Sequence, residues 1–337
     1  MMDKKTRGDH APIVPQTQTL TKDSKRNVAR GIFELGRLHT KEAWLCWYPA
    51  VWGACLSAGT QNISLDVFTF ARILLGILTS VTASHAALCT FNDICDRNFD
   101  KDVERCKTRP LPAGMLTTME AILAYIAWIP ATVAITYFTL GGVGVKTFTP
   151  IWILSMIYPF GKRYIQFPQI VLGCVIGGAV FPGWAVITNS LDGLEGAAPL
   201  FAAVFCWVVY FDVFYATQDR PDDEKVGVKS LAVLLGDRVP IFLGFLGLLQ
   251  VGFFAMTALR ANMSFIFWVF GVAVWAVNMP WHVLSLDVKD RKSGGKIFKA
   301  NILLGLYMTG VALVELLATR VNLLSMGHIG QRAGFVV

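Results

Sequence analysis

Residues 68–91 read FTFARILLGILTSVTASHAALCTF and run directly into the acidic stretch NDICDRNFD, Asn92–Asp100. The first stretch has about the length of a helix that crosses a lipid bilayer. The second half of the chain repeats this order, because the apolar residues 197–217 run into QDRPDDE, Gln218–Glu224. Carboxylates are costly at a membrane boundary unless a function requires them there. We therefore expect the two acidic clusters to form one shared site for divalent cations and a polyanion.

The composition is that of a membrane protein. Of the 337 residues, 54% are hydrophobic and 16% are charged, and the mean hydropathy is +0.53, whereas soluble domains average about 25% charged residues. Backbone groups in hydrocarbon must be hydrogen-bonded internally, so the pattern predicts an all-α integral membrane protein with Asp-rich cytosolic loops. Nine runs with few charges are the expected transmembrane helices: residues 43–62, 68–92, 117–141, 147–161, 166–188, 197–217, 239–259, 264–287 and 298–319.

The placement of the 30 Lys and Arg residues predicts a topology. If the N-terminal tail is cytosolic, all but five of these residues lie in that tail or in cytosolic loops. The five exceptions are Arg72, Lys146, Arg260, Arg320 and Arg332. Such an asymmetry follows the positive-inside rule and places both acidic clusters on the cytosolic side. Membrane topology thus explains the net charge of +7, and no nucleic-acid partner is expected.

One transmembrane catalytic domain is expected over residues 43–320, between a cytosolic tail (1–42) and a short C-terminal tail (321–337). Within the first tail, residues 28–39 can form an amphipathic helix that lies at the membrane interface. Its lipid-facing side would hold Ile32, Phe33 and Leu35.

Targeting features favour the endoplasmic reticulum. The first 42 residues contain no apolar secretory h-region, and acidic residues such as Asp3 and Asp9 make them unlike a mitochondrial presequence. Two N-x-S sequons, at Asn62 and Asn262, fall on the non-cytosolic side of the predicted topology and are candidate glycosylation sites. We therefore expect a multi-pass protein of the endoplasmic reticulum membrane, with the mitochondrial inner membrane as the alternative.

The first acidic cluster has the spacing of a metal site on a helix. Asn92, Asp96 and Asp100 recur every four residues, so they share one helical stripe, and Asp93 lies beside them as a fourth candidate ligand. Mg²⁺ takes oxygen ligands, often one or two carboxylates, and fills its other positions with water and phosphate oxygens. The alternative is a solvated acidic helix end that attracts its basic neighbours.

The second cluster pairs Asp219 with Asp223, one helical turn further on. Upstream, Asp212 and Tyr215 share the face of Asp219, seven and four residues before it. Asp212 lies inside an apolar span, where an ionisable side chain is a functional candidate by default. The alternative for Asp212 is a hydrogen bond or ion pair between helices.

Two Mg²⁺ ions held by two such clusters would match a diphosphate, because the metal neutralises the leaving group as a C–O bond breaks. Basic side chains should complete the anion site. The candidates are Arg97, Lys101, Lys107, Arg109, Lys162, Arg163, Lys225 and Lys229. Lys162 and Arg163 stand out because they occupy a tight cytosolic turn between two spans. His85, seven residues before Asn92, is a candidate wall of an acceptor cavity or, equally, a helix-packing histidine.

Four ordered motifs resemble the UbiA superfamily of intramembrane aromatic prenyltransferases. They are NDICDRNFD, KTRPLPAG (107–114), YPFGKRYIQFPQIVLG (158–173) and YATQDRPDDEKVGVKS (215–230). The resemblance implies nine transmembrane helices around a central cavity, dependence on Mg²⁺ and a prenyl diphosphate donor. By motif position it implies a first metal site at Asn92, Asp96 and Asp100, a second at Asp219 and Asp223, and Lys162 and Arg163 near the diphosphate or the acceptor.

The start of the first span, RLHTKEAWLCWYPAVWGACLSAG (37–59), is similar to fungal members that build meroterpenoids. This similarity implies transfer of a farnesyl group from farnesyl diphosphate to a polyketide-derived phenol or pyrone. The residues expected to carry the reaction are Asp96, Asp219, Lys162, Arg163, Asp212 and Tyr215. Those expected to bind substrate are Arg97, Lys101, Arg109, Lys225, Lys229 and His85.

Two other functions are compatible with parts of the pattern. The 4-hydroxybenzoate polyprenyltransferases of ubiquinone biosynthesis carry nearly the same motifs, and they are the alternative within the family. A cation-coupled transporter would also hold carboxylates within its helices, but near the middle of the bilayer. The carboxylates here fall at the predicted cytosolic ends of the spans, which argues against transport.

Overall fold

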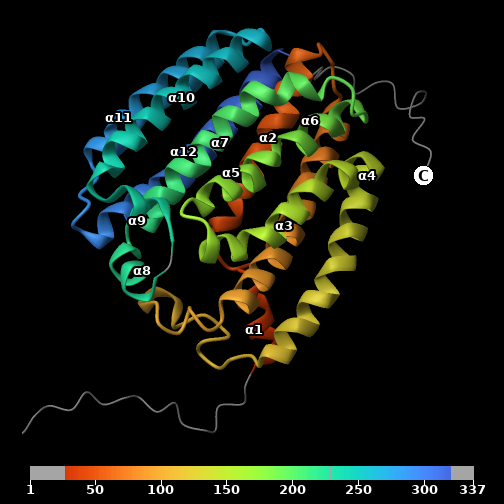
Figure 1. Ribbon diagram of the computed structural model, residues 1–337. Coiled ribbons are helices and arrows are strands. Elements are labelled where there is room, and N and C mark those ends of the chain that lie inside the picture. Colours follow the sequence, from red (N-terminus) through yellow and green to blue (C-terminus); the bar gives the residue numbers. More distant parts are fainter. Residues whose placement is uncertain (1–26, 228, 320–337) are drawn as a thin grey trace, which may run out of the picture.

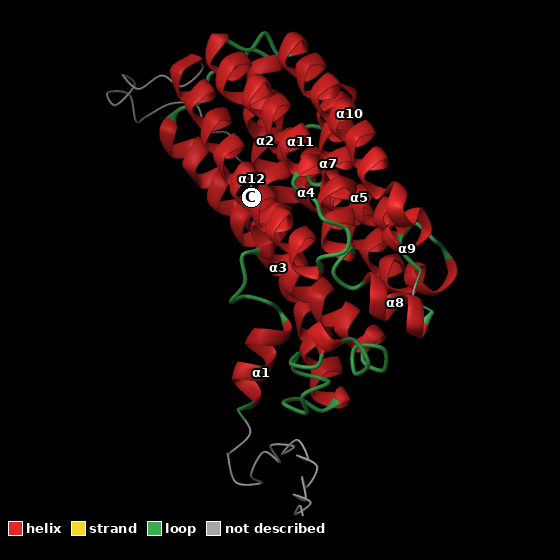
Figure 2. Cartoon of the chain, turned by 90° about the vertical axis from the view of Figure 1, so that its left-hand side faces the viewer, coloured by secondary structure: helices red, strands yellow, loops and turns green. Residues whose placement is uncertain are grey.

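The computed structural model describes residues 27–227 and 229–319, and every regular element in these ranges is a helix (Figure 2). The long helices run side by side as a single bundle (Figure 1). In chain order, the α-helices are α1 Val28–Leu35, α2 Glu42–Thr60, α3 Val67–Asp96, α4 Thr118–Tyr164, α5 Pro168–Gly178, α6 Val180–Thr188, α7 Ala198–Ala216, α8 Arg220–Val226, α9 Leu231–Leu235, α10 Val239–Arg260, α11 Val274–Leu284 and α12 Arg291–Thr319. A π-helical stretch, Phe267–Ala273, leads into α11.

Several of these helices can span a membrane, as predicted. Seven helical segments in the described part of the chain are long and apolar enough to cross: Val67–Asp96, Thr118–Gly161, Pro168–Thr188, Leu194–Ala216, Leu231–Arg260, Phe267–Leu284 and Arg291–Thr319. The chain is therefore an all-α, multi-pass membrane protein, although the predicted number of nine spans is not confirmed.

Two features account for the difference between nine and seven. The prediction divided residues 117–161 into two spans, whereas α4 is continuous apart from Gly141, whose φ of 72° and ψ of −174° interrupt the helix. Its two halves therefore point in different directions (Figure 1). The prediction also counted α2, which is not among the seven; it contains Glu42, Tyr48, Pro49 and three Trp residues.

The helix α1 packs against protein. Leu35 is fully buried in a small cluster with Leu116 and Ala121, and Ile32 packs at the edge of that cluster. The prediction that Leu35 faces lipid is therefore wrong, because the loop between α3 and α4 folds back beneath α1 and covers this residue. Phe33 remains 46% exposed. Most of the first tail (residues 1–26) and all of the second (321–337) lie outside the described residues.

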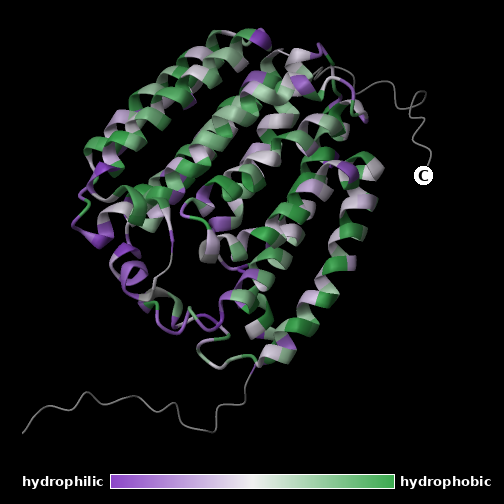
Figure 3. Ribbon diagram, viewed as in Figure 1, coloured by the Kyte–Doolittle hydropathy of each residue, from purple (hydrophilic) through white to green (hydrophobic). Residues whose placement is uncertain are grey.

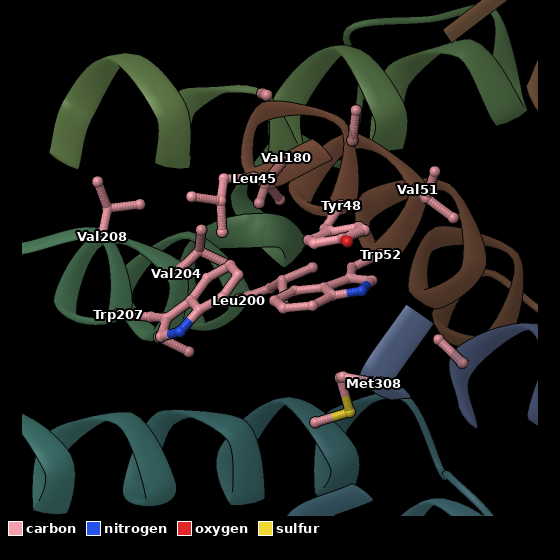
Figure 4. Close-up of a cluster of buried hydrophobic side chains, with 14 of the residues drawn as sticks. Leu45, Tyr48, Val51, Trp52, Val180, Leu200, Val204, Trp207, Val208 and Met308 are labelled. Atoms are coloured by element: carbon pink, nitrogen blue, oxygen red, sulfur yellow. The ribbon is translucent and has the colours of Figure 1, made fainter. Parts of the chain in front are cut away.

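Tyr48, Trp52 and Trp207 pack among aliphatic side chains where α2, α7 and α12 meet (Figure 4). Trp52, Trp207 and Trp275 have ring centroids 5.2–5.9 Å apart. Each indole N–H donates to a polar side chain: Trp52 to Thr309, Trp207 to Asn301 and Trp275 to Gln250. A buried indole N–H without an acceptor would be costly in a bundle surrounded by hydrocarbon. The interior between these helices is consequently filled at the level of the three Trp rings.

The helices α2 and α6 approach so closely that their backbones touch. A Cβ atom on Gly183 would lie 1.9 Å from the Ala50 carbonyl oxygen, and one on Gly53 would lie 2.3 Å from that of Val180. Small residues permit such contacts between membrane helices. This seam closes the bundle on the side away from the acidic clusters.

Hydrophilic residues gather at the opposite end of the bundle, around α8 and the loop from α3 to α4 (Figure 3). The start of α8 and the end of α3 both lie there (Figure 1). The fold thus brings together the two acidic clusters, which are more than 110 positions apart in the sequence.

Candidate active site

A cavity of about 500 Å³ lies inside the bundle and is lined by residues from α2, α3, α4, α5 and α7 and from the loops at the hydrophilic end. Its size is in the ordinary range for sites that bind small molecules. The deeper walls are apolar, whereas the end near α8 is polar and is called the mouth here. The cavity contains most of the predicted site residues: His85, Asn92, Asp96, Asp100, Arg109, Asp212, Tyr215, Asp219, Asp223 and Lys229.

Five other predicted residues do not line this cavity. Lys107 is exposed and pairs with Glu104. Arg97 folds back, with Nη1 donating to the Ile94 carbonyl oxygen at 2.8 Å. Lys101 and Lys225 are exposed at the surface. Asp93 is buried beside the cavity in ion pairs. Lys162 and Arg163 lie in the last turn of α4, where the structure describes their backbone but not their side chains.

The last turns of α3 present the first acidic cluster to the cavity. Asp96 is the final residue of α3, and Asp100 follows in the turn after it, with only 5% and 6% of these residues exposed. One turn earlier, the Asn92 Oδ1 atom is buried and has no hydrogen-bond partner among the described residues. A buried acceptor of this kind is unfavourable unless something binds to it. A hard cation satisfies such an oxygen, so this cluster fits Mg²⁺.

The start of α8 presents the second cluster from the other side of the mouth. Asp219 precedes the first turn of α8, in which Pro221 sets the backbone, and Asp223 is buried within the helix. Between them, Asp222 points away and accepts two hydrogen bonds of 3.0 Å from the Arg291 guanidinium on α12. These bonds lower the pKa of the Asp222 carboxyl group and anchor α8. Asp222 thus holds the helix while its neighbours face the cavity.

The candidate oxygen ligands are divided between the end of α3, with the turn after it, and the start of α8. In the part of the chain that the structure describes, no three His, Cys, Asp or Glu side chains form a compact metal cage. Mg²⁺ is usually held by one or two carboxylates together with water and substrate phosphates. The two separated carboxylate pairs fit this mode of binding, in which a phosphate group bridges them, better than a cage made only of protein.

Asp93 connects two arginines at the edge of the cavity. Its Oδ1 accepts hydrogen bonds from Arg37 Nη2 at 3.0 Å and from Arg109 Nη1 at 3.3 Å. Arg109 also donates to Asp100 Oδ2 at 2.9 Å, and Arg37 to Glu42 Oε2 at 3.4 Å. The prediction grouped Asp93 with the metal ligands, but its Oδ1 accepts from two guanidinium groups and it does not line the cavity. Its geometry is that of a residue that orients Arg37 and Arg109.

Sequence reasoning did not find Arg37 as a site residue. It lies in the link between α1 and α2 with a φ of 53°, a conformation that costs a non-glycine residue about 1–3 kcal/mol. The Asp93 and Glu42 ion pairs hold it there, and its side chain reaches the cavity. Only its position in the motif at the start of the first span could have singled it out, since no spacing rule links residue 37 to residue 93.

An aromatic wall lines the mouth on the side of α7 and α12. The ring centroid of Phe298 lies 4.5 Å from that of Tyr215 and 5.8 Å from that of Phe211, and all three residues line the cavity. Asp212 lies on the same side. Phe298 was not predicted, because nothing in the sequence distinguishes it from the other apolar residues of its helix. This wall offers flat surfaces on which a planar ring can stack.

The opposite wall carries His85, Cys89, Gln169 and Lys229. The Cys89 sulfur lies 3.5 Å from His85 Nε2, one helical turn away on α3. Gln169, which was also missed, accepts a hydrogen bond from the Leu231 N–H at 3.1 Å and so ties α5 to α9. Lys229 donates to the Tyr164 carbonyl oxygen at 3.4 Å. These contacts fix the loop between α8 and α9, which carries Lys229, against the ends of α4 and α5.

Comparison with known proteins agrees with this geometry. The sequence profile described as the UbiA prenyltransferase family matches residues 46–306. Polyprenyl transferase macG of Penicillium terrestre is 64% identical over 313 residues, which cover 93% of this chain and 98% of the relative. Polyprenyl transferase yanG of Aspergillus niger is 60% identical over 311 residues, which cover 89% of this chain and 94% of the relative.

Solved structures share the fold at low sequence identity. A UbiA homolog from Aeropyrum pernix K1 superposes with a TM-score of 0.68 and 21% identity, over 82% of this chain and 98% of that one. A UbiA homolog from Archaeoglobus fulgidus, bound to GPP and Mg²⁺, superposes with a TM-score of 0.60 and 20% identity, over 83% of this chain and 99% of that one. At this level of identity the likeness establishes the fold alone.

Proposed function

Because the chain belongs to the UbiA prenyltransferase family, we propose that this membrane prenyltransferase transfers a farnesyl group from farnesyl diphosphate to a polyketide-derived phenol or pyrone. The observation that carries the proposal is the cavity, in which the carboxylates of α3 and α8 meet at one end of an apolar chamber. Such a chamber suits a donor with a charged head and a hydrocarbon tail. The similarity to fungal polyprenyl transferases supports a role in meroterpenoid biosynthesis.

The diphosphate would bind at the mouth. Asn92, Asp96 and Asp100 on one side, with Asp219 and Asp223 on the other, would hold Mg²⁺. When bound, Mg²⁺ supplies positive charge that stabilises the departing diphosphate. The Mg²⁺ and GPP bound to the Archaeoglobus fulgidus homolog support this assignment.

Basic side chains would complete the diphosphate site. Arg109 and Lys229 line the cavity. Arg37, which shares the Asp93 carboxylate with Arg109, lines it as well. Guanidinium groups donate to phosphate oxygens in a bidentate manner, which suits them to this role. Lys162 and Arg163 remain proposed members of this group, on the basis of their motif and of their position at the end of α4.

Cleavage of the C–O bond would leave an allylic cation, which must be kept from water. The apolar residues of the deeper walls exclude water from that region. The acceptor ring would stack against the aromatic wall of Tyr215, Phe211 and Phe298, where its electron-rich carbon attacks the cation. Asp212 and His85 face the same space and would orient the acceptor hydroxyl groups. The ring proton released afterwards would leave with the diphosphate.

Assay of microsomes that contain the chain tests this proposal. Farnesyl and geranylgeranyl diphosphates should be offered with a panel of phenolic acids and pyrones, with and without Mg²⁺. We expect Mg²⁺-dependent farnesylation of a phenol or pyrone. Exclusive use of 4-hydroxybenzoate with a long-chain donor would instead support the ubiquinone pathway and refute the proposed one.

The same preparation tests the proposed location and domain boundaries. We propose that the protein resides in the endoplasmic reticulum and that residues 43–320 form the catalytic domain. Co-fractionation with a mitochondrial inner-membrane marker would contradict the first proposal. A shift in mass after glycosidase treatment would identify modification at Asn62 or Asn262, and single Asn→Gln variants would assign it.

A further inference from the structure

The cavity extends away from the acidic clusters along three helices and ends at a similar depth on each. Its lining runs from Asn92 to Val81 on α3, from Tyr158 to Phe148 on α4 and from Gln169 to Ala179 at α5. Ten or eleven residues separate the ends of each stretch, which is about 15–16 Å at the rise of an α-helix. On α7, in contrast, no described residue before Phe211 lines the cavity. The deep arm therefore lies between α3, α4 and α5.

Three apolar residues form the floor of this arm. Val81, Phe148 and Ala179 are the lining residues farthest from the mouth on their respective elements, and they are 4%, 2% and 6% exposed. Ala179 leads directly into α6, which packs on α2 at Gly183 with backbone contact. The space beyond the floor is consequently occupied by close-packed helices.

The Phe148 ring is held by a neighbour one turn nearer the mouth on α4. Its ring stacks on that of Trp152, with centroids 5.8 Å apart and planes inclined by 15°. The Trp152 Nε1 donates to Ser84 Oγ at 2.9 Å, and Ser84 belongs to α3. This hydrogen bond crosses from α4 to α3 and holds the Trp152 ring in place, so Trp152 blocks the Phe148 ring from turning toward the mouth.

The length of the arm matches one class of prenyl chain. Carbon–carbon single bonds of about 1.5 Å advance an extended chain by about 1.25 Å each. A farnesyl chain, with eleven bonds from its first to its last main-chain carbon, is then about 14 Å long, and a geranylgeranyl chain, with fifteen, is about 19 Å long. With the diphosphate at the level of Asn92, the first chain reaches the floor and the second would pass through it.

We propose that Phe148, supported by Val81 and Ala179, determines the length of the donor, admitting fifteen-carbon chains and rejecting twenty-carbon chains. The proposal rests on the proposed function, because it assumes that the deep arm receives the tail of a prenyl diphosphate. It adds the direction of that tail, along α3 to α5 and away from the aromatic wall, and it assigns the selecting side chain.

The test compares donors competing for one acceptor in membranes that contain the full chain. Phe148→Ala opens the floor, and we expect it to raise the ratio of geranylgeranyl to farnesyl transfer by about 10- to 100-fold, the range for extra methylene groups in an apolar pocket. Val81→Phe raises the floor and should raise the ratio of geranyl to farnesyl transfer. Phe138→Ala is the matched control, because Phe138 lies on the same helix and is 83% exposed.

The outcomes separate this proposal from the proposed function. If the unaltered chain farnesylates an acceptor and both Phe148→Ala and Val81→Phe leave its donor ratios unchanged, the floor does not select length and only the present inference fails. If the unaltered chain uses no prenyl diphosphate, the proposed function itself fails. Should Phe148→Ala not accumulate, Phe148→Leu is used instead, because it keeps an apolar side chain of smaller volume. The donor ratios of Phe148→Leu and Val81→Phe then show whether the floor selects chain length.

Discussion

Replacement of Asp93 should mainly lower stability, whereas replacement of Asp96, three positions later, should mainly lower activity. Asp93 is 1% exposed and accepts hydrogen bonds from Arg37 and Arg109, whereas Asp96 lines the cavity. We expect Asp93→Asn to lower stability and Asp96→Asn to abolish turnover with little effect on folding. The pair therefore separates the residue that orients the site from the residue that acts in it.

The expected magnitudes follow from the surroundings of each side chain. Breaking a buried ion pair typically costs about 3–5 kcal/mol, but the Arg37 and Arg109 side chains are 21% and 17% exposed and retain Glu42 and Asp100 as partners. A loss of about 2–3 kcal/mol for Asp93→Asn is therefore expected, since water and these partners compensate in part. For Asp96→Asn, loss of one metal carboxylate should lower kcat/KM by about 10³-fold, which corresponds to roughly 4 kcal/mol of transition-state stabilisation.

Two measurements on detergent-solubilised protein check this contrast. Thermal unfolding reports stability, and farnesyl transfer at several Mg²⁺ concentrations reports activity and metal affinity. Asp192→Asn is the matched control, because Asp192 is exposed in a loop before α7. The reasoning is refuted if Asp93→Asn loses activity and Mg²⁺ affinity at an unchanged melting temperature, or if Asp96→Asn destabilises the fold as much as Asp93→Asn does.

Three further predictions address the metal, the anchor of α8 and the helix seam. Chelation with EDTA should abolish transfer, and added Mg²⁺ should restore it; activity that persists in EDTA would exclude metal dependence. Arg291 lowers the pKa of Asp222, so their pairing stabilises the fold above the ordinary carboxyl pKa of about 4, and this stabilisation is lost as pH falls through the lowered pKa. The difference in melting temperature between the unaltered chain and Asp222→Asn should therefore shrink only in acid. A difference that stays constant down to pH 2 would contradict this. Gly183→Ala should prevent accumulation of folded protein, because the new Cβ would meet the Ala50 carbonyl, whereas Gly310→Ala, which meets nothing within 4 Å, should be tolerated.

The sequence predicted the membrane helices and most of the charged residues that line the cavity, because both depend on local patterns. Long apolar runs define the spans, and the four-residue spacing of Asn92 and Asp96 defines one face at the end of α3. Asp100 was expected on the same helical stripe, but α3 ends at Asp96 and Asp100 lies in the turn beyond it. The same spacing rule could not classify Asp93, since it lies three residues before Asp96 and one after Asn92. Its separation from the metal ligands depends on Arg37 and Arg109, which approach from other parts of the chain.

Residues that long-range packing brings to the cavity were beyond sequence reasoning. Phe298 resembles its apolar neighbours in composition, and only the contact between α7 and α12 places its ring beside Tyr215. Arg37 reaches the cavity through a left-handed backbone turn that no short pattern announces. The number of spans was uncertain for a related reason, because the break at Gly141 depends on how the two halves of α4 pack against α3.

The polar contacts of α2 have a consequence for the order in which the protein assembles. Tyr48 and Trp52 hydrogen-bond to Ile302 and Thr309, which follow them by 254 and 257 positions. At a synthesis rate of about 5–20 residues per second, the ribosome needs roughly 13–50 s to make those partners. During this time the Tyr48 hydroxyl and the Trp52 indole of α2 lack these acceptors. Synthesis of α12 is therefore the step that lets α2 complete its buried hydrogen bonds.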